Sequence, residues 1–160
     1  MNDRIERLTD AHGAATAQGE FGSAAGWAWR VQSRILVLYA RGRAQLDGAQ
    51  WATDVMDRLV AEEHSARGRR VYLAWSFEDI HGYRPDVGMH FVRWFEANRA
   101  ALNRLMVYTE NSILRMTARA TSITFAPGGM TFPRSAAAFD RGVDAWAEHV
   151  RSGRGRPRAS

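Results

Sequence analysis

The stretch that decides the fold reads VYLAWSFED, from Val71 to Asp79. Its first five residues are apolar without interruption, which is typical of a strand buried on both faces of a sheet. The more polar residues 76–79 end this run, and we expect a loop over residues 80–84. Pro85 and Asp86 then favour the first turn of a helix.

The same alternation of strand and helix extends through most of the chain. Strands are expected at 21–32, 35–40, 71–75, 105–108 and 130–132. Apolar residues recur at helical spacing within 49–60, 91–102, 113–117 and 139–150. Caps for these helices are offered by Asp47, by Asn111 or Ser112, and by Ser135.

The predicted fold class is α/β, with the element order β-β-α-β-α-β-α-β-α. Two adjacent strands at the start predict a hairpin. The strand and helix alternation that follows predicts a mostly parallel sheet with right-handed crossovers and helices packed on the sheet. We expect a flexible lead-in over residues 1–20 with one helical turn at 4–9, a single domain over 21–150, and a disordered basic tail over 151–160.

Composition excludes several kinds of chemistry. Cysteine is absent, which rules out disulfides and thiolate sites, and all 22 basic residues are Arg, which rules out a Schiff-base lysine and a Walker A loop. No apolar run reaches the roughly 20 residues that a membrane span needs. The polar start MNDRIERLTD does not resemble a secretory signal, so we expect a cytoplasmic protein.

Net charge gives little support to nucleic-acid binding. The formal charge is +5, and Arg151, Arg154, Arg156 and Arg158 supply four of these charges, which leaves 5 − 4 = +1 for the rest. Such an Arg-rich end is more often solvated than functional. Nucleic acid is therefore not an expected partner, and attachment to a polyanion through the tail is the third of three functional hypotheses.

Three local patterns, taken in order, resemble a known superfamily. The first is the 71–79 strand with its acidic end, followed by His81-Gly82-Tyr83 and a helix containing Trp94. The second is the 108–116 segment, in which a strand leads into Asn111-Ser112. The third is the closing Ala138-Phe139-Asp140 with Ala145-Trp146. Together they resemble the STAS/SEC14-type superfamily, in particular the SpoIIAA-like proteins and uncharacterised STAS-like proteins of bacteria.

The resemblance implies a module without enzymatic activity or cofactor that binds a regulatory protein. SEC14-type relatives bind lipids or other apolar ligands, so the resemblance also allows a carrier or sensor of a small apolar molecule. In anti-sigma-antagonist relatives, a Ser or Thr at the start of the helix after the third strand is phosphorylated. It has no match here, because residues 80–88 contain neither residue type. A phosphorylation switch is therefore not expected.

Polar residues follow two of the expected strands and form the candidate partner-binding site. The carboxyl ends of parallel strands meet at one edge of a sheet, and a helix that starts there presents free N–H groups. The simpler alternatives are a helix cap for Asn111 or Ser112 and an ordinary surface loop for His81 and Tyr83. The site consists of Asp79, His81, Gly82, Tyr83, Asn111 and Ser112.

No catalytic or metal-binding residues are expected. Ser76, Asp79 and His81 are too close along one strand end for a triad, and there is no G-x-S-x-G elbow. Glu78 and Asp79 are adjacent on a strand, so without a local bend they point to opposite faces. No two His residues have ligand spacing. Trp27 and Trp29 share one strand face, and packing beneath a helix is favoured over lining a pocket.

Overall fold

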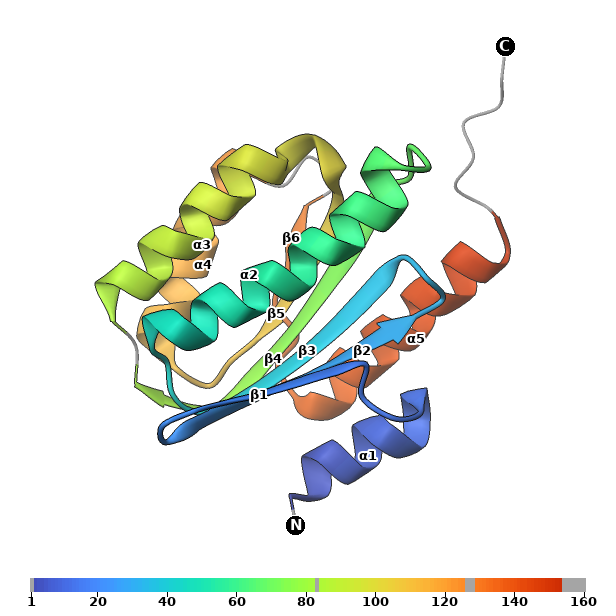
Figure 1. Cartoon of the computed structure of the whole chain (residues 1–160). Coiled ribbons are helices and arrows are strands. Elements are labelled where there is room, and N and C mark those ends of the chain that lie inside the picture. Colours follow the sequence, from blue (N-terminus) through green and yellow to red (C-terminus); the bar gives the residue numbers. More distant parts are fainter. Residues whose placement is uncertain (1, 83, 126–128, 154–160) are drawn as a thin grey trace.

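The longest strand, β4 (Val71–Gly82), runs through the middle of a six-stranded sheet with the order β1-β2-β3-β4-β5-β6. The computed structural model describes residues 2–82, 84–125 and 129–153 (Figure 1). The other strands are β1 (Ala17–Phe21), β2 (Ala24–Val31), β3 (Ile35–Arg43), β5 (Leu102–Tyr108) and β6 (Met130–Thr131). The α-helices are α1 (Asp3–His12), α2 (Leu46–Val60), α3 (Pro85–Asn98), α4 (Ser112–Phe125) and α5 (Ala136–Arg151), with short helices η1 (Ala61–Ser65) and η2 (Arg99–Ala101).

The pairing of the strands follows the predicted plan. β1, β2 and β3 are antiparallel, whereas β3 to β6 are parallel to one another. Gln32 and Ser33 turn the chain between β2 and β3, both with positive φ, as tight hairpin turns between twisted strands require. The α/β fold class and the predicted order from β2 to α5 are confirmed.

Residues 1–20, expected as a flexible lead-in with one helical turn at 4–9, contain more regular structure than that turn. These residues form α1 and most of β1, and the strand expected at 21–32 is split, because β1 ends at Phe21 and β2 begins at Ala24. The periodicity of α1 is faint in the sequence, since Leu8 is its only fully buried apolar side chain. The helix is attached largely by a buried Arg4, which an apolar pattern cannot reveal.

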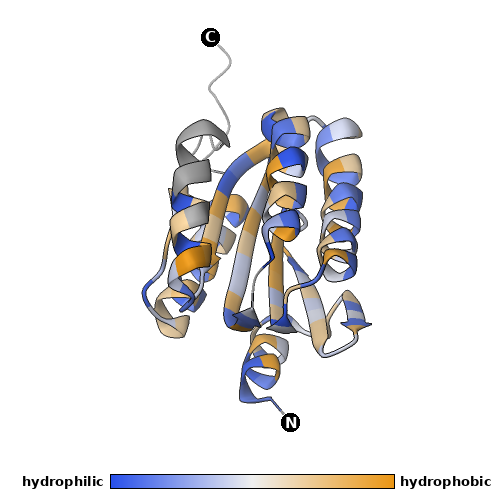
Figure 2. Cartoon of the chain, turned by 90° about the vertical axis from the view of Figure 1, so that its left-hand side faces the viewer, coloured by the Kyte–Doolittle hydropathy of each residue, from blue (hydrophilic) through white to orange (hydrophobic). Residues whose placement is uncertain are grey.

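The sheet separates two apolar layers (Figures 1 and 2). On one side, α2, α3 and α4 cover the sheet and contribute Met56, Trp94 and Phe95 to the core. On the other side, α1 and α5 contribute Leu8 and Phe139. Of the six helix residues predicted to be buried on the sheet, five are buried and Phe91 is half-buried; the five are Trp94, Phe95, Phe139, Val143 and Trp146.

Trp27 and Trp29 lie in the layer beneath α1 and α5. The indole Nε1 of Trp29 donates to the carbonyl oxygen of Gly13, just after α1, at 3.1 Å. The interpretation that these residues pack beneath a helix is confirmed.

The carboxyl end of the chain differs slightly from expectation. Helix α5 includes Arg151, the residue at which the basic tail was expected to begin, and Arg151 Nη1 donates to Glu148 Oε2 at 2.6 Å. The remaining tail Arg residues, at 154, 156 and 158, lie outside the described residues.

None of the described helices has the length and apolar character needed to cross a bilayer.

A buried guanidinium holds α1 against the sheet. Arg4 is only 2% exposed, and its two terminal nitrogens donate to the two carboxylate oxygens of Asp140 on α5, each at 2.7 Å. Its Nε lies 2.7 Å from Glu78 Oε1 on β4. Burial alone would lower the pKa of Arg4, but the hydrogen bonds and negative charges of Asp140 and Glu78 outweigh burial and raise it. The ion pairs therefore join α1, α5 and β4.

We predict that Arg4→Met destabilises the protein by about 3 kcal/mol, because it leaves two carboxylates without their cation. Chemical denaturation followed by circular dichroism measures this loss. Arg7→Met is the matched control, since Arg7 is an exposed residue on the same helix, and its stability should stay within about 0.5 kcal/mol of wild type. Equal stability of the two variants would contradict the assigned role of Arg4.

Candidate ligand pocket

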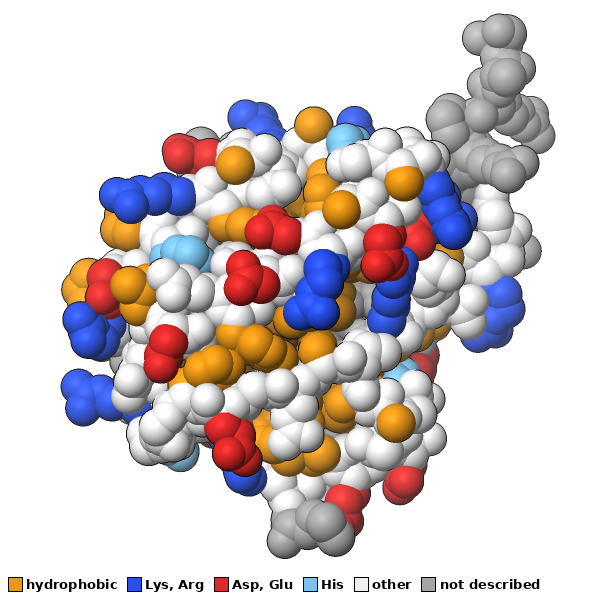
Figure 3. Space-filling view, viewed as in Figure 1, with side chains coloured by type: hydrophobic (Ala, Val, Ile, Leu, Met, Phe, Trp, Pro, Cys, Tyr) orange, Lys and Arg blue, Asp and Glu red, His pale blue; other side chains and the backbone are white. Residues whose placement is uncertain are grey.

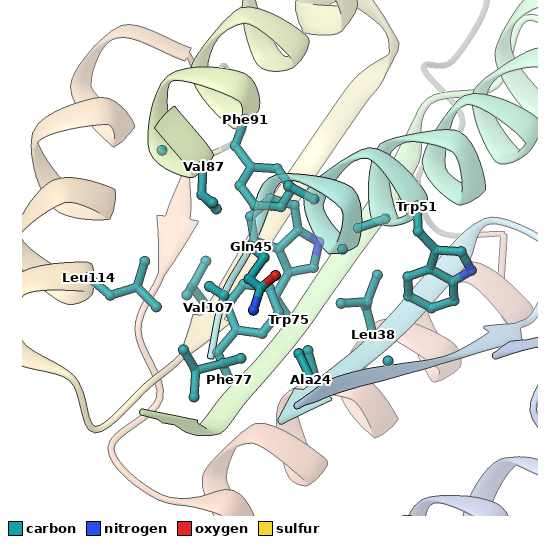
Figure 4. Close-up of a pocket in the computed structure, with 18 of the residues that line it drawn as sticks. Ala24, Leu38, Gln45, Trp51, Trp75, Phe77, Val87, Phe91, Val107 and Leu114 are labelled. Atoms are coloured by element: carbon teal, nitrogen blue, oxygen red, sulfur yellow. The ribbon is translucent and has the colours of Figure 1, made fainter. Parts of the chain in front are cut away.

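A hollow of about 970 Å³, open mouth included, lies between the sheet and helices α2, α3 and α4. Its floor is formed by β2 to β5 and its roof by the three helices (Figure 4). Representative lining side chains are Leu38, Trp75 and Val107 from the sheet and Trp51, Phe91 and Leu114 from the helices. Among the described lining residues, only Arg41 and Gln45 have polar side chains.

The hollow exists because small residues of the sheet face small residues of α2. Ala24 and Ala40 lie on the strands, and Ala52 lies on the helix. Protein cores normally fill such space with larger side chains. An apolar space lined by these alanines remains beneath the helices.

The mouth region is shaped by the close approach of Trp51 to β2. A Cβ atom on Gly26 would lie 2.5 Å from Trp51 Cζ3, so only glycine lets this ring lie against the strand. The rings of Trp51 and Phe21 are 5.7 Å apart between centroids. Apolar side chains are visible at the surface between α2 and the β1–β2 hairpin (Figure 3).

Polar contacts between two roof helices hold the opposite side of α2 in place. Trp94 Nε1 on α3 donates to Asp57 Oδ1 on α2 at 2.7 Å. A second hydrogen bond joins Thr53 Oγ1 and His90 Nε2 at 2.9 Å. These bonds fix α2 to α3.

Two polar groups belong to the pocket or its rim. Gln45 precedes α2 as its N-cap residue and makes no side-chain capping bond, whereas Asp47, expected as the cap, lies in the first turn. The Gln45 amide points among the lining side chains (Figure 4). The guanidinium carbon of Arg41 lies 5.0 Å from the ring of Trp27, which belongs to the opposite layer. Gln45 therefore contributes polarity to the pocket, and Arg41 directs its charge elsewhere.

The first group of predicted site residues lies mainly on a strand, and not in the loop that the sequence predicts. Asp79, His81 and Gly82 lie within β4, which continues to Gly82, so the expected loop over 80–84 is wrong at its start. The reason is the extended partner strand, because Arg41 to Arg43 of β3 pair with β4 there. His81 is exposed, Gly82 is half-buried, and Tyr83 lies outside the described residues.

A β-bulge turns Glu78 and Asp79 toward α1. Tyr39 is opposite Ser76 and Arg41 is opposite Asp79, so β4 advances three residues while β3 advances two. Glu78 consequently contacts Arg4, and Asp79 accepts a hydrogen bond from the Tyr39 hydroxyl. The bulge is the local bend for which the sequence analysis made an exception, and the two carboxylates accordingly do not diverge.

The Tyr39 hydroxyl connects Asp79 to the N-terminus of α1. It accepts a hydrogen bond from Asn2 Nδ2 at 2.6 Å. Burial, together with the hydrogen bond and the charge of Asp79, raises the pKa of Tyr39 well above its ordinary value. Tyr39 therefore remains a donor to Asp79. The Asp79 carboxylate has an internal partner and contributes to holding α1.

The second group of predicted site residues begins α4. Asn111 Oδ1 accepts from the backbone N–H groups of Ile113 and Leu114 at 3.0 and 3.1 Å. The cap interpretation is thus confirmed for Asn111, and Ser112 beside it is exposed. Sequence reasoning did not identify the apolar hollow itself, since it arises from small residues far apart in the chain.

Comparisons with known proteins support the fold. No family model matches the chain, and no curated protein is significantly similar to it in sequence. Among solved structures, it is similar to the crystal structure of an uncharacterised protein of the DUF3478 family with a SpoIIAA-like fold from Shewanella loihica PV-4. The similarity has a TM-score of 0.57 and 12% sequence identity, and covers 81% of this chain and 97% of that chain. The chain has a SpoIIAA-like fold.

We predict that Asn111→Ala lowers the free energy of unfolding by about 1 kcal/mol, because it removes the oxygen that caps α4. Ser112→Ala is the matched control and should leave stability within about 0.5 kcal/mol of wild type. Urea denaturation of the three proteins measures both values. A larger loss for Ser112→Ala than for Asn111→Ala would contradict the assignment of the cap.

Proposed function

We propose that this chain is a binding module for a small apolar molecule, held in the hollow beneath α2, α3 and α4, and that it performs no chemistry on that molecule. The observation that carries this proposal is the hollow itself. It lies between the sheet and the three helices, and it is open to solvent on one side. Its lining is apolar apart from Gln45 and Arg41.

The absence of a reactive group among the described lining residues supports binding over catalysis. Catalysis needs a nucleophile, an acid or base, or a preorganised charge next to the reacting atoms. The Gln45 amide does not titrate, and the Arg41 guanidinium lies over Trp27 in the other layer. The strongly polar cluster of Arg4, Glu78 and Asp140 is also outside this space, on the α1 side of the sheet.

The geometry favours this function over the regulatory protein-binding role that the resemblance implies. Two of the six candidate residues, Asp79 and Asn111, have internal partners. Exposed His81 and Ser112 stay available for a protein partner, and that role stays a prediction, as does the cytoplasmic location. The hollow, by contrast, has an apolar lining that specifies a class of ligand.

We predict that the wild-type protein binds a neutral apolar dye such as Nile red and that Ala40→Phe weakens this binding at least tenfold. Ala40 is a half-buried floor residue, so a phenyl ring there occupies space that the ligand needs. Fluorescence titration measures the dissociation constant. Thermal unfolding of the variant should stay at or above the wild-type midpoint, because the new ring fills a hollow.

Ala145→Phe is the matched control, because Ala145 is exposed on α5 across the sheet from the hollow. It should bind the dye with wild-type affinity. Organic extraction of the purified protein and mass spectrometry should also recover an apolar molecule that is reduced in Ala40→Phe. The proposal fails if the wild-type protein neither binds the dye nor retains an apolar molecule, or if both variants bind alike.

A further inference from the structure

The floor of the hollow contains a polar hydrogen without a partner. Trp75 is 5% exposed, and its indole Nε1 is shut off from solvent with no hydrogen-bond acceptor among the described residues. A buried indole N–H normally finds an acceptor, because leaving it unpaired is costly. This side chain lies at the centre of the lining (Figure 4).

Two other buried tryptophans of the same chain have an acceptor for the indole N–H. Trp29 donates to the Gly13 carbonyl oxygen at 3.1 Å, and Trp94 donates to Asp57 Oδ1 at 2.7 Å. Both lie in packed layers outside the lining of the hollow. The unpaired indole N–H therefore belongs to a residue that lines the candidate ligand space.

The described side chains around Trp75 offer no replacement acceptor. Its ring lies between the rings of Phe77, Phe91 and Phe95, at centroid distances of 5.3, 4.9 and 5.3 Å. These rings contain no hydrogen-bonding oxygen or nitrogen. An acceptor can reach Nε1 when a molecule enters the hollow and moves between the aromatic side chains, of which Phe91 is only half-buried.

We propose that the ligand is a neutral apolar molecule with a carbonyl oxygen that accepts a hydrogen bond from Trp75 Nε1. This inference rests on the proposed function of the hollow. A neutral ligand is favoured because the described part of the chain directs no cationic side chain into the space, and a buried carboxylate without a cation is strongly disfavoured. The Gln45 amide at the rim is likewise neutral.

The test compares three probes of equal chain length: decane, 2-decanone and decanoate. Each displaces Nile red from the wild-type protein, and the dissociation constants are compared. We expect 2-decanone to bind roughly tenfold more tightly than decane, since the ketone gives the N–H the partner it lacks. Decanoate should bind more weakly than 2-decanone.

A nuclear magnetic resonance measurement identifies the group responsible. The indole ¹H–¹⁵N signal of Trp75 should move downfield with 2-decanone and stay nearly unchanged with decane, because a hydrogen bond deshields the proton. Trp75→Phe assigns the signal and should bind the two probes with equal affinity. Trp51→Phe is the matched control, because it removes another indole of the lining and should retain the preference for the ketone.

The outcomes separate this inference from the proposed function. If the dye and all three probes fail to bind, both proposals are wrong. If decane and 2-decanone bind the wild-type protein equally, or decanoate binds most tightly, the hollow is a ligand site but the carbonyl inference is wrong. If Trp75→Phe does not fold, the wild-type probe series and the signal shift, assigned through Trp variants elsewhere in the chain, still decide the question.

Discussion

The burial of β4 on both faces is the constraint on which the rest of the structure depends. A strand covered on both sides needs an apolar layer above and below, and alternate side chains supply them. Leu73 and Trp75 point into the layer of α2, α3 and α4, whereas Tyr72 and Ala74 point into that of α1 and α5. Both layers are needed, because an uncovered face would expose these rings and aliphatic groups to water.

The bulge in β4 separates the apolar part of this strand from its polar end. Before it, Tyr39 and Ser76 are opposite each other in regular register; after it, the strand has shifted by one residue. Because of this shift, both carboxylates help to hold α1. Glu78 forms an ion pair with Arg4, and Asp79 accepts a hydrogen bond from the Tyr39 hydroxyl. A helix with a single fully buried apolar side chain is thereby secured by charge and hydrogen bonding, and it covers Trp29.

Much of this architecture can be predicted from the sequence, because continuous apolar runs and helical spacing report which faces are buried. The order from β2 to α5 and the caps Asn111 and Ser135 are readable in this way. Helix α1 cannot be predicted in this way. Its buried Arg4 looks like a surface arginine in the sequence until its partners on β4 and α5 are known. The hollow is equally hidden. Ala24, Ala40 and Ala52 are unremarkable separately, and only the fold brings these small side chains together.

Trp75 illustrates why the sequence alone could not distinguish a core residue from a binding residue. Its position in a buried apolar run is that of a core side chain, and three phenyl rings surround it as in a core. Phenylalanine would fill much of that space without placing an N–H among carbon atoms. The unpaired group lowers the stability of the empty protein, and a ligand that accepts from it would favour the folded state through binding. The same side chain can therefore close the sheet face and distinguish one apolar ligand from another.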